Sequence, residues 1–162
     1  TDSFLDFLTQ QVDDERATAI DIGCGAGANC HWLHQEFPEW DLTGIDVDEE
    51  LLKIARERNP DAEFNALPIE EAISEFGDGA FEYVMSLQFI SFVETSRREF
   101  LEVTCELATE GVAFTSLFSE GWIEQETTAR DLDEGWEGQY IVYSLPRLEA
   151  ELAEIDPAAI GK

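Results

Sequence analysis

Positively charged side chains are scarce in this chain of 162 residues. Nine Lys and Arg residues stand against 37 Asp and Glu residues, and the formal net charge at pH 7 is −28. Broad nucleic-acid surfaces use Lys and Arg to neutralise phosphates, and anionic membrane surfaces attract the same residues. The composition therefore argues against both kinds of partner. Because the acids are spread along the whole chain, we interpret them as a solvated surface adapted to high salt rather than one acidic docking patch.

The chain also has few cysteines and no long apolar run. No run approaches the ~20 residues that span a bilayer, and no signal peptide is visible. The first residue is Thr1 rather than Met, so we expect a trimmed N-terminus. Cys24, Cys30 and Cys105 form neither a metal-ligand spacing nor an even set of disulfide partners. These absences predict reduced thiols, no metal site and a cytoplasmic location.

What the chain does contain is a glycine-rich stretch after a short apolar run. Ala19–Ile22 predicts a buried strand that includes one acid, Asp21, and three glycines follow at alternate positions: Gly23, Gly25 and Gly27. Glycines let the backbone turn sharply and approach a ligand closely, and the helix predicted after them turns its free N–H groups to the same place. We predict a strand–loop–helix cradle for a nucleotide-like ligand. The alternative is a glycine turn that only packs the strand on the helix.

The glycine spacing separates two kinds of cradle. A dinucleotide fingerprint reads G-x-G-x-x-G and seats a pyrophosphate, whereas this loop reads G-x-G-x-G. The carboxylate of Asp21 would repel a pyrophosphate but suits a ligand with an ammonium group. The stretch resembles the first motif, D-x-G-x-G-x-G, of the class I S-adenosylmethionine-dependent methyltransferases. The resemblance implies S-adenosyl-L-methionine as the cofactor, with Asp21 orienting its methionine part.

A second predicted strand, Leu42–Asp46, also ends in an acid. An acid at this place can accept hydrogen bonds from both hydroxyls of a ribose, and the resemblance gives this role to Asp46. It also places Val47 beside the adenine. We interpret Asp48 differently, as the N-cap of a helix over Glu49–Arg58.

The third and fourth predicted strands complete the cofactor set. After the third, Ala62–Ala66, either Leu67 or Ile69 could stack on the adenine, and Glu70 could replace an acid that the family places there. The fourth, Phe81–Ser86, ends next to the first strand, where open α/β sheets bind ligands. The cofactor-binding residues that the resemblance implies are Asp21, Gly23, Cys24, Gly25, Gly27, Asp46, Val47, Leu67, Ser86 and Leu87. For Cys24 the favoured role is to fill space in the loop, because no base lies beside it in sequence to make it a nucleophile.

The substrate side is less defined by the sequence. Gln88 and Phe89 follow the fourth strand and either line the methyl-transfer pocket or pack in the core. Trp122 lies in a loosely patterned segment, residues 119–143, whose aromatic residues either line a substrate site or anchor an irregular loop on the core. His31 and His34 lie three apart on a predicted helix, and we interpret them as ordinary helix residues.

The predicted fold is a three-layer, Rossmann-like α/β domain with a mainly parallel sheet in the order 3-2-1-4-5. A long helix over Thr95–Ala108, a turn at Glu110–Gly111 and a fifth strand over Val112–Phe118 fit this fold, and an amphipathic helix over Ser3–Val12 precedes it. We expect one domain over residues 1–162, with a core at 18–118 and a variable segment at 119–162 whose last helix Ser144 caps. The final hairpin of the family, strands six and seven, has no counterpart, and we favour a fragment over a sheet closed by a partner.

These features predict transfer of a methyl group from S-adenosylmethionine to a small-molecule acceptor. The sequence identifies no general base and no acceptor, and self-association into a homo-oligomer stays open. One alternative is a non-catalytic module that binds S-adenosylmethionine or a protein partner. A less favoured alternative is a nicotinamide-dependent oxidoreductase on a related sheet, against which the glycine spacing and Asp21 weigh.

Overall fold

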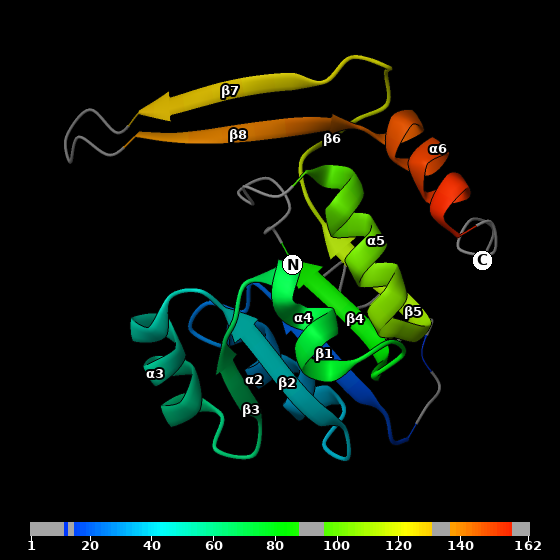
Figure 1. The fold of residues 1–162 in the computed structure, drawn as a ribbon. Coiled ribbons are helices and arrows are strands. Elements are labelled where there is room, and N and C mark those ends of the chain that lie inside the picture. The colour runs from blue at the N-terminus through cyan, green and yellow to red at the C-terminus, as the bar shows by residue number, and fades with distance from the viewer. Residues whose placement is uncertain (1–11, 13–14, 88–95, 131–136, 157–162) are drawn as a thin grey trace.

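The computed structural model describes residue 12 and residues 15–87, 96–130 and 137–156. Its largest unit is a five-stranded parallel sheet with the strand order β3-β2-β1-β4-β5 (Figure 1). The predicted order is therefore confirmed. The strands are β1 (Thr18–Ile22), β2 (Asp41–Asp46), β3 (Glu63–Ala66), β4 (Phe81–Leu87) and β5 (Ala108–Thr115).

Helices cover both faces of this sheet and make the three predicted layers. Along β1 the side chains alternate: Ile20 and Ile22 join a core cluster with Phe100, whereas Ala19 packs in a second cluster with Leu33. Phe100 belongs to one helical layer and Leu33 to the other, so the two faces of β1 are both buried. The helices are α2 (Ala28–Glu36), α3 (Glu49–Arg58), α4 (Ala72–Phe76) after the 3-10 turn η1 (Ile69–Glu71), α5 (Arg97–Leu107) and α6 (Leu145–Ile155).

Local sequence determines where several helices begin. The carboxylate of Asp48 accepts hydrogen bonds from the backbone N–H groups of Glu50 and Leu51, at 2.9 and 3.3 Å, and so caps α3 as predicted. The hydroxyl of Ser144 accepts from the backbone N–H of Arg147 at 3.3 Å and caps α6. The helix α3 begins and ends at the residues that the sequence predicted.

The end of the long helix differs from the prediction. We expected a turn at Glu110–Gly111, but β5 begins at Ala108, directly after the last residue of α5. The register between β4 and β5 shifts by one residue between Phe81 and Tyr83. This irregularity accommodates one extra residue in β5, as a β-bulge does. The predicted turn was therefore wrong, and the strand begins earlier and ends earlier than we expected.

The segment predicted as loosely patterned contains a second sheet. Its strands are β6 (Phe118–Ser119), β7 (Gln125–Arg130) and β8 (Glu137–Ser144), in the order β6-β8-β7. β7 and β8 form an antiparallel ladder of six residue pairs and extend as a long ribbon above the first sheet (Figure 1). The sequence did not indicate β7 because its residues are polar, without the apolar alternation of a half-buried strand. This ribbon precedes α6, so it is not the hairpin that the family places after its last helix.

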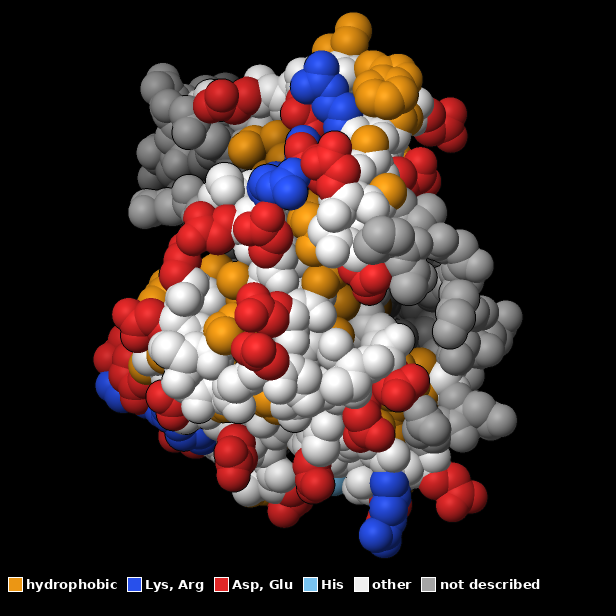
Figure 2. Space-filling model, turned by 45° about the vertical axis from the view of Figure 1, so that its right-hand side comes forward, with side chains coloured by type: hydrophobic (Ala, Val, Ile, Leu, Met, Phe, Trp, Pro, Cys, Tyr) orange, Lys and Arg blue, Asp and Glu red, His pale blue; other side chains and the backbone are white. Residues whose placement is uncertain are grey.

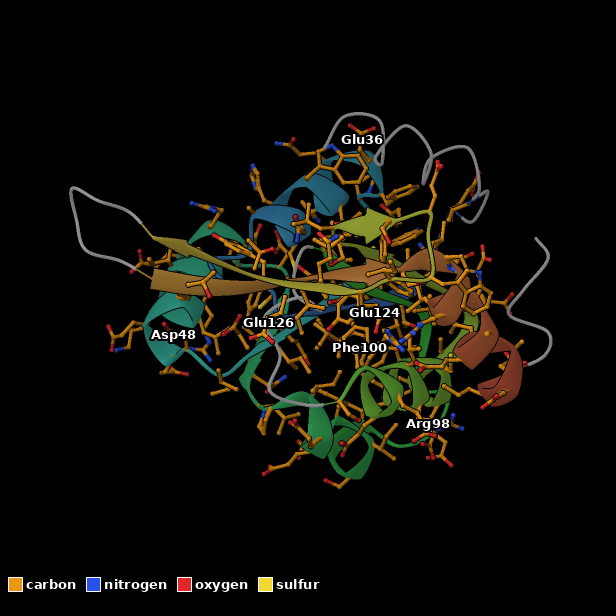
Figure 3. All side chains as sticks on the ribbon, turned by 90° about the horizontal axis from the view of Figure 1, so that it is seen from above. Glu36, Asp48, Arg98, Phe100, Glu124 and Glu126 are labelled. Carbon is orange, nitrogen blue, oxygen red and sulfur yellow. The ribbon has the colours of Figure 1, made fainter. Side chains whose placement is uncertain are left out.

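Arg97 links α5 to the second sheet and to α6. Its guanidinium donates to both carboxylate oxygens of Glu151 in α6, at 2.7 and 2.5 Å, and also to Glu124. Glu124 accepts a further hydrogen bond, of 3.3 Å, from the backbone N–H of Ser144, and lies between the β7–β8 ribbon and α5 (Figure 3). The Arg97 side chain is only 14% exposed. Salt therefore screens these ion pairs less than pairs on the open surface.

The described surface carries the expected excess of acids. On the face drawn in Figure 2, Asp and Glu side chains are spread over the described residues and outnumber Lys and Arg. No described helix is both long enough and apolar enough to cross a membrane. The predicted helix over Ser3–Val12 lies outside the described residues, apart from Val12, which is buried against the second core cluster.

Candidate cofactor-binding site

The glycine loop after β1 is held against the end of β2 by its own backbone. The backbone N–H groups of Gly23 and Cys24 both donate to the carbonyl oxygen of Ile45, at 2.9 and 3.0 Å. Gly23, Gly25 and Gly27 have φ values of 73°, 51° and 71°, in the left-handed region that residues with a side chain rarely adopt. The loop therefore needs glycine at these three positions for conformational reasons alone.

Gly25 and Gly27 have different surroundings. Among the described residues, a Cβ built on Gly25 would meet only the Cδ1 atom of Leu51, at 4.0 Å, so the backbone there faces open space in this part of the chain. A Cβ on Gly27 would come within 2.6 Å of Nδ2 of Asn59 and 2.9 Å of Cβ of Ala55. Gly25 thus leaves room for a ligand against the loop, whereas Gly27 leaves room for α3 to pack.

Asp46, at the end of β2, holds the loop in place. Its Oδ2 atom accepts a hydrogen bond from the backbone N–H of Gly25 at 2.8 Å, and its Oδ1 atom accepts from that of Asp48 at 2.9 Å. Its carbonyl oxygen accepts from the backbone N–H of Leu67 at 3.0 Å. Each carboxylate oxygen has a second lone pair. Asp46 can therefore hold the loop and still accept hydrogen bonds from a ligand.

Asp21 is the buried acid of β1. It is 1% exposed, and its Oδ2 atom accepts a hydrogen bond from Nδ2 of Asn29 at 3.2 Å. Its Oδ1 atom is buried without a hydrogen-bond partner, and it is the one such side-chain atom in the described part of the chain. Burial raises the pKa of Asp21 to about 7; the hydrogen bond from Asn29 opposes this rise, and the charge of Asp46 adds to it.

The cysteine within the loop is a packing residue. Cys24 is buried, and its sulfur lies 2.8 Å from the position that a Cβ on Gly44 would take. Burial, together with the charges of Asp21 and Asp46, raises the pKa of the Cys24 thiol well above its usual range. A thiol in this environment stays protonated at neutral pH and is a poor nucleophile.

The order of strands, the three-glycine loop and the two acids at adjacent strand ends together match a known family. Residues 19–111, from β1 into β5, match the family described as methyltransferase domain. The chain belongs to the class I S-adenosylmethionine-dependent methyltransferases. The matched segment contains Asp21, the glycine loop and Asp46.

Individual methyltransferases are similar to this chain over different lengths. The trans-aconitate 2-methyltransferase of Rhizobium meliloti (strain 1021) is 34% identical over 85 residues, which are 49% of this chain and 33% of that protein. The trans-aconitate 2-methyltransferase of Rhodopseudomonas palustris (strain BisA53) is 27% identical over 143 residues, which are 78% of this chain and 55% of that protein. The chain thus spans about a third to about half of the length of these two curated relatives.

A solved structure supports the fold of the methyltransferase domain. The S-adenosylmethionine dependent methyltransferase from Mesorhizobium loti has a TM-score of 0.70, with 15% identity, over 93% of this chain and 79% of that chain. At this identity the likeness concerns the fold alone, and one fold can carry many activities.

Membership of the family implies S-adenosyl-L-methionine as the cofactor, and the residues present fit it. The open face of Gly25 gives backbone access. The unpartnered Oδ1 atom of Asp21 is an acceptor that a ligand N–H could satisfy. Asp46 adds a second carboxylate, on the adjacent strand.

The other residues predicted to bind the cofactor differ in how exposed they are. Val47 is 71% exposed beside Asp46, and Leu67 is half-buried against the main core cluster. Ser86 is buried at the end of β4, where its hydroxyl donates to the carbonyl oxygen of Ile22 at 3.1 Å, so it joins β4 to β1. Leu87, half-buried, is the last residue of β4.

None of the three residues predicted to bind the substrate is placed beside the glycine loop by the described part of the structure. Gln88 and Phe89 lie outside the described residues. Trp122 is 63% exposed in the connection between β6 and β7. It lies in a connection of the second sheet and not in the glycine loop.

Sequence reasoning missed two side chains near the loop. Asn29, the second residue of α2, contacts the buried acid of β1, and Leu51 in α3 lies nearest to the open face of Gly25. A signal for Asn29 existed, because an amide in the first turn of the helix after the loop faces back toward the strand that precedes it. Leu51 gave no such signal, since an apolar residue in a helix is usually core.

The two histidines lie away from the glycine loop. His31 and His34 line a hollow of about 100 Å³ together with Leu42, near the start of β2, and Asp61, just before β3. These positions are at the amino ends of the strands, opposite the edge that carries Asp46. Within the described residues, no group of three or more His, Cys, Asp or Glu side chains could hold a metal ion.

Proposed function

We propose that this methyltransferase domain transfers a methyl group from S-adenosylmethionine to a small-molecule acceptor. The observation that carries the proposal is the buried, unpartnered Oδ1 atom of Asp21 beside a glycine loop whose middle residue faces open space. When bound, the cofactor supplies an electrophilic methyl group on a sulfonium. The protein's part is to hold donor and acceptor in line and to keep water out.

Asp21 would accept a hydrogen bond from the ammonium group of the cofactor. A buried carboxylate oxygen without a donor is costly in the free protein, and an ammonium group would both satisfy the hydrogen bond and neutralise the charge. The same contact would favour the ionised form of Asp21. Gly25 would let the cofactor approach the backbone at a distance that a side chain would prevent.

Asp46 would hold the ribose. It has a free lone pair on each carboxylate oxygen, while its existing hydrogen bonds to the loop and to Asp48 fix its orientation before a ligand arrives. Exposed Val47 and half-buried Leu67 would contact the adenine. Leu87, the last residue of β4, would line the cofactor site from that strand. On the acceptor side, Gln88, Phe89 and Trp122 remain proposals from the sequence.

Two observations support a small acceptor. The net charge of −28 disfavours nucleic acid as a substrate, and two relatives are named for methylation of a small carboxylic acid, trans-aconitate. We propose no general base, because His31 and His34 line a hollow at the amino ends of the strands, away from the glycine loop. An acceptor that is already a nucleophile at neutral pH needs none.

The first test is calorimetric titration with S-adenosylhomocysteine, the demethylated product, and with NADH. We expect binding of S-adenosylhomocysteine alone, and loss of this binding in Asp21→Asn and Asp46→Asn. Asp61→Asn is the matched control, an exposed acid at the opposite edge of the sheet. Failure of the unaltered protein to bind S-adenosylhomocysteine, or binding of NADH instead, would refute the proposal.

The second test separates an enzyme from a module that only binds. The protein is incubated with S-adenosylmethionine labelled on its methyl group and with a metabolite panel that begins with trans-aconitate. We expect the label in one small product. Binding without transfer to any member of a broad panel would favour the non-catalytic alternative.

We also propose that the acidic surface is an adaptation to high salt in a cytoplasmic protein. At low salt, like charges on a folded surface repel one another, and dissolved ions screen this repulsion. The wide spread of acids over the described surface supports this reading (Figure 2).

A further inference from the structure

The carboxylate of Asp21 is held from one side only. Odd-numbered residues of β1 face the layer that contains α2, so Asp21 lies inside the protein rather than at its surface. From the first turn of α2, Asn29 donates to Oδ2 at 3.2 Å. The other oxygen, Oδ1, is buried and has no donor among the residues that the structure describes.

Among the described residues, Asp46 at the end of β2 is the charged group that opposes the negative charge of Asp21. The other titratable groups beside it are two thiols, Cys24 in the glycine loop and Cys30 in α2, whose pKa values burial and the charge of Asp21 raise, so both stay protonated and neutral. None of these groups is a cation. In the described part of the chain, the amide of Asn29 is therefore the polar group that stabilises the ionised carboxylate.

We propose that Asn29 is a positioning residue for the cofactor: it fixes Oδ2 of Asp21 and keeps the carboxylate ionised, so that Oδ1 can accept a hydrogen bond from the ligand's ammonium group. This inference rests on the proposed function. Asn29 lies on a different element from the glycines and the two acids, and it acts through Asp21 without itself contacting the ligand.

A pH dependence follows. Burial raises the pKa of Asp21 to about 7, and the hydrogen bond from Asn29 lowers it from a still higher value. The ionised form accepts the ammonium group, so affinity for an ammonium-bearing ligand falls as pH drops through the pKa of Asp21. Removal of the Asn29 amide moves this fall to higher pH.

The experiment is calorimetric titration between pH 6 and 9 with two probes. S-adenosylhomocysteine carries the ammonium group, and 5′-methylthioadenosine has the same nucleoside and thioether without it. If Asn29→Leu raises the pKa of Asp21 by about one unit, S-adenosylhomocysteine binds about five-fold more weakly at pH 7 and almost equally at pH 9. The affinity for 5′-methylthioadenosine stays the same throughout.

Two further variants make the result specific. Asn29→Ala also removes the amide, with a different packing defect, and should give the same pH profile. Gln35→Ala is the matched control, because Gln35 is an exposed amide on the same helix whose side chain contacts His31 instead. It should reproduce the profile of the unaltered protein. Carbon-13 NMR of the Asp21 carboxyl group follows its titration directly, without any ligand.

The outcomes distinguish this inference from the proposed function. If the unaltered protein does not bind S-adenosylhomocysteine at any pH, both fail. If it binds, but both Asn29 variants keep its pH profile and its Asp21 titration, the role of Asn29 alone is overturned. A loss that is equal at pH 7 and pH 9, or equal for both probes, would likewise overturn it by indicating a general defect.

Discussion

The backbone N–H of Gly25 donates to Oδ2 of Asp46 at 2.8 Å, so the middle of the glycine loop and the end of β2 form one hydrogen-bonded unit. The same carboxylate accepts from Asp48 at the start of α3. The two strand ends that would hold a nucleoside are therefore connected before any ligand binds. Such preorganisation lowers the cost of ordering a loop on binding.

Gly25 and Gly27 should respond differently to alanine. Both substitutions place a side chain at positive φ, which costs about 1–3 kcal/mol. Gly27→Ala also forces a contact with Asn59 and Ala55 and should lower the free energy of unfolding by about 1–3 kcal/mol more. Gly25→Ala should lower mainly the affinity for S-adenosylhomocysteine. Urea unfolding and calorimetry measure the two effects, and equal stability of the variants would contradict the assignment.

Asp21→Asn should stabilise the free protein above neutral pH. The pKa of Asp21 is about 7 in the folded protein against an ordinary value of 3.8. Because the folded state binds the proton more tightly, stability falls as pH rises from about 4 to 7, and the penalty is complete above pH 7. The variant removes this penalty, and we expect a gain of about 1–3 kcal/mol at pH 8. Denaturant unfolding at pH 5 and pH 8 checks it, with a smaller gain expected at pH 5.

Ser86→Ala tests the join between β4 and β1. The substitution leaves one acceptor, the carbonyl oxygen of Ile22, without its buried donor, at a cost of about 1–2 kcal/mol. Ser74→Ala is the control, since the Ser74 hydroxyl donates to the carbonyl oxygen of Glu71 on the exposed surface and its loss should cost less than about 0.5 kcal/mol. Thermal unfolding of both variants measures these costs, and a larger loss of stability in Ser74→Ala than in Ser86→Ala would contradict the prediction.

The adjacent residues Arg97 and Arg98 should differ in importance. Arg97→Met leaves the partly buried carboxylate of Glu151 without its bidentate partner and leaves Glu124 with only the longer, 3.6 Å pair to Arg147, so it should cost about 2–4 kcal/mol. Arg98 is about half exposed, and its pairs with Glu102 and Glu154 lie on the surface, so Arg98→Met should cost less than about 1 kcal/mol. Similar unfolding free energies would contradict the anchoring role of Arg97.

The Arg97 pair also predicts a response to acid. The hydrogen bond from Arg97 lowers the pKa of Glu151 below its ordinary value of 4.5. The pair therefore contributes stability above about pH 4.5, and this contribution is lost as pH falls through the lower, folded-state pKa. In the same unfolding measurements, the difference between Arg97→Met and the unaltered protein should shrink below pH 4.

Salt should stabilise this protein. With a net charge of −28, repulsion among surface carboxylates opposes the compact state, and KCl screens it. Between 0.1 and 3 M KCl we expect a gain of about 1 kcal/mol or more, which is about 2–4 °C in melting temperature for a domain of this size. A melting temperature that is flat or falls with KCl would refute the high-salt interpretation.

Several features could be predicted because they depend on neighbours in sequence. The alternation of glycines predicted a sharply turning loop after β1, and Asp48 predicted where α3 begins. The order of strands followed from the resemblance carried by Asp21, the glycines and Asp46. Backbone turns and helix caps favour particular residue types, so they can be predicted from the sequence nearby.

Other features were decided by the tertiary structure alone. The residues next to Gly27 in sequence do not indicate that α3 packs against it. Asn29 contacts Asp21 only because α2 folds back over β1. The residues of β7 are mostly polar, and their partners in β8 follow only from the pairing of the two strands. The sequence by itself determined the loop, the caps and the strand order. Long-range packing decided which glycine faces open space, what holds the buried acid and where Arg97 finds its two carboxylates, because these contacts join residues that are remote along the chain.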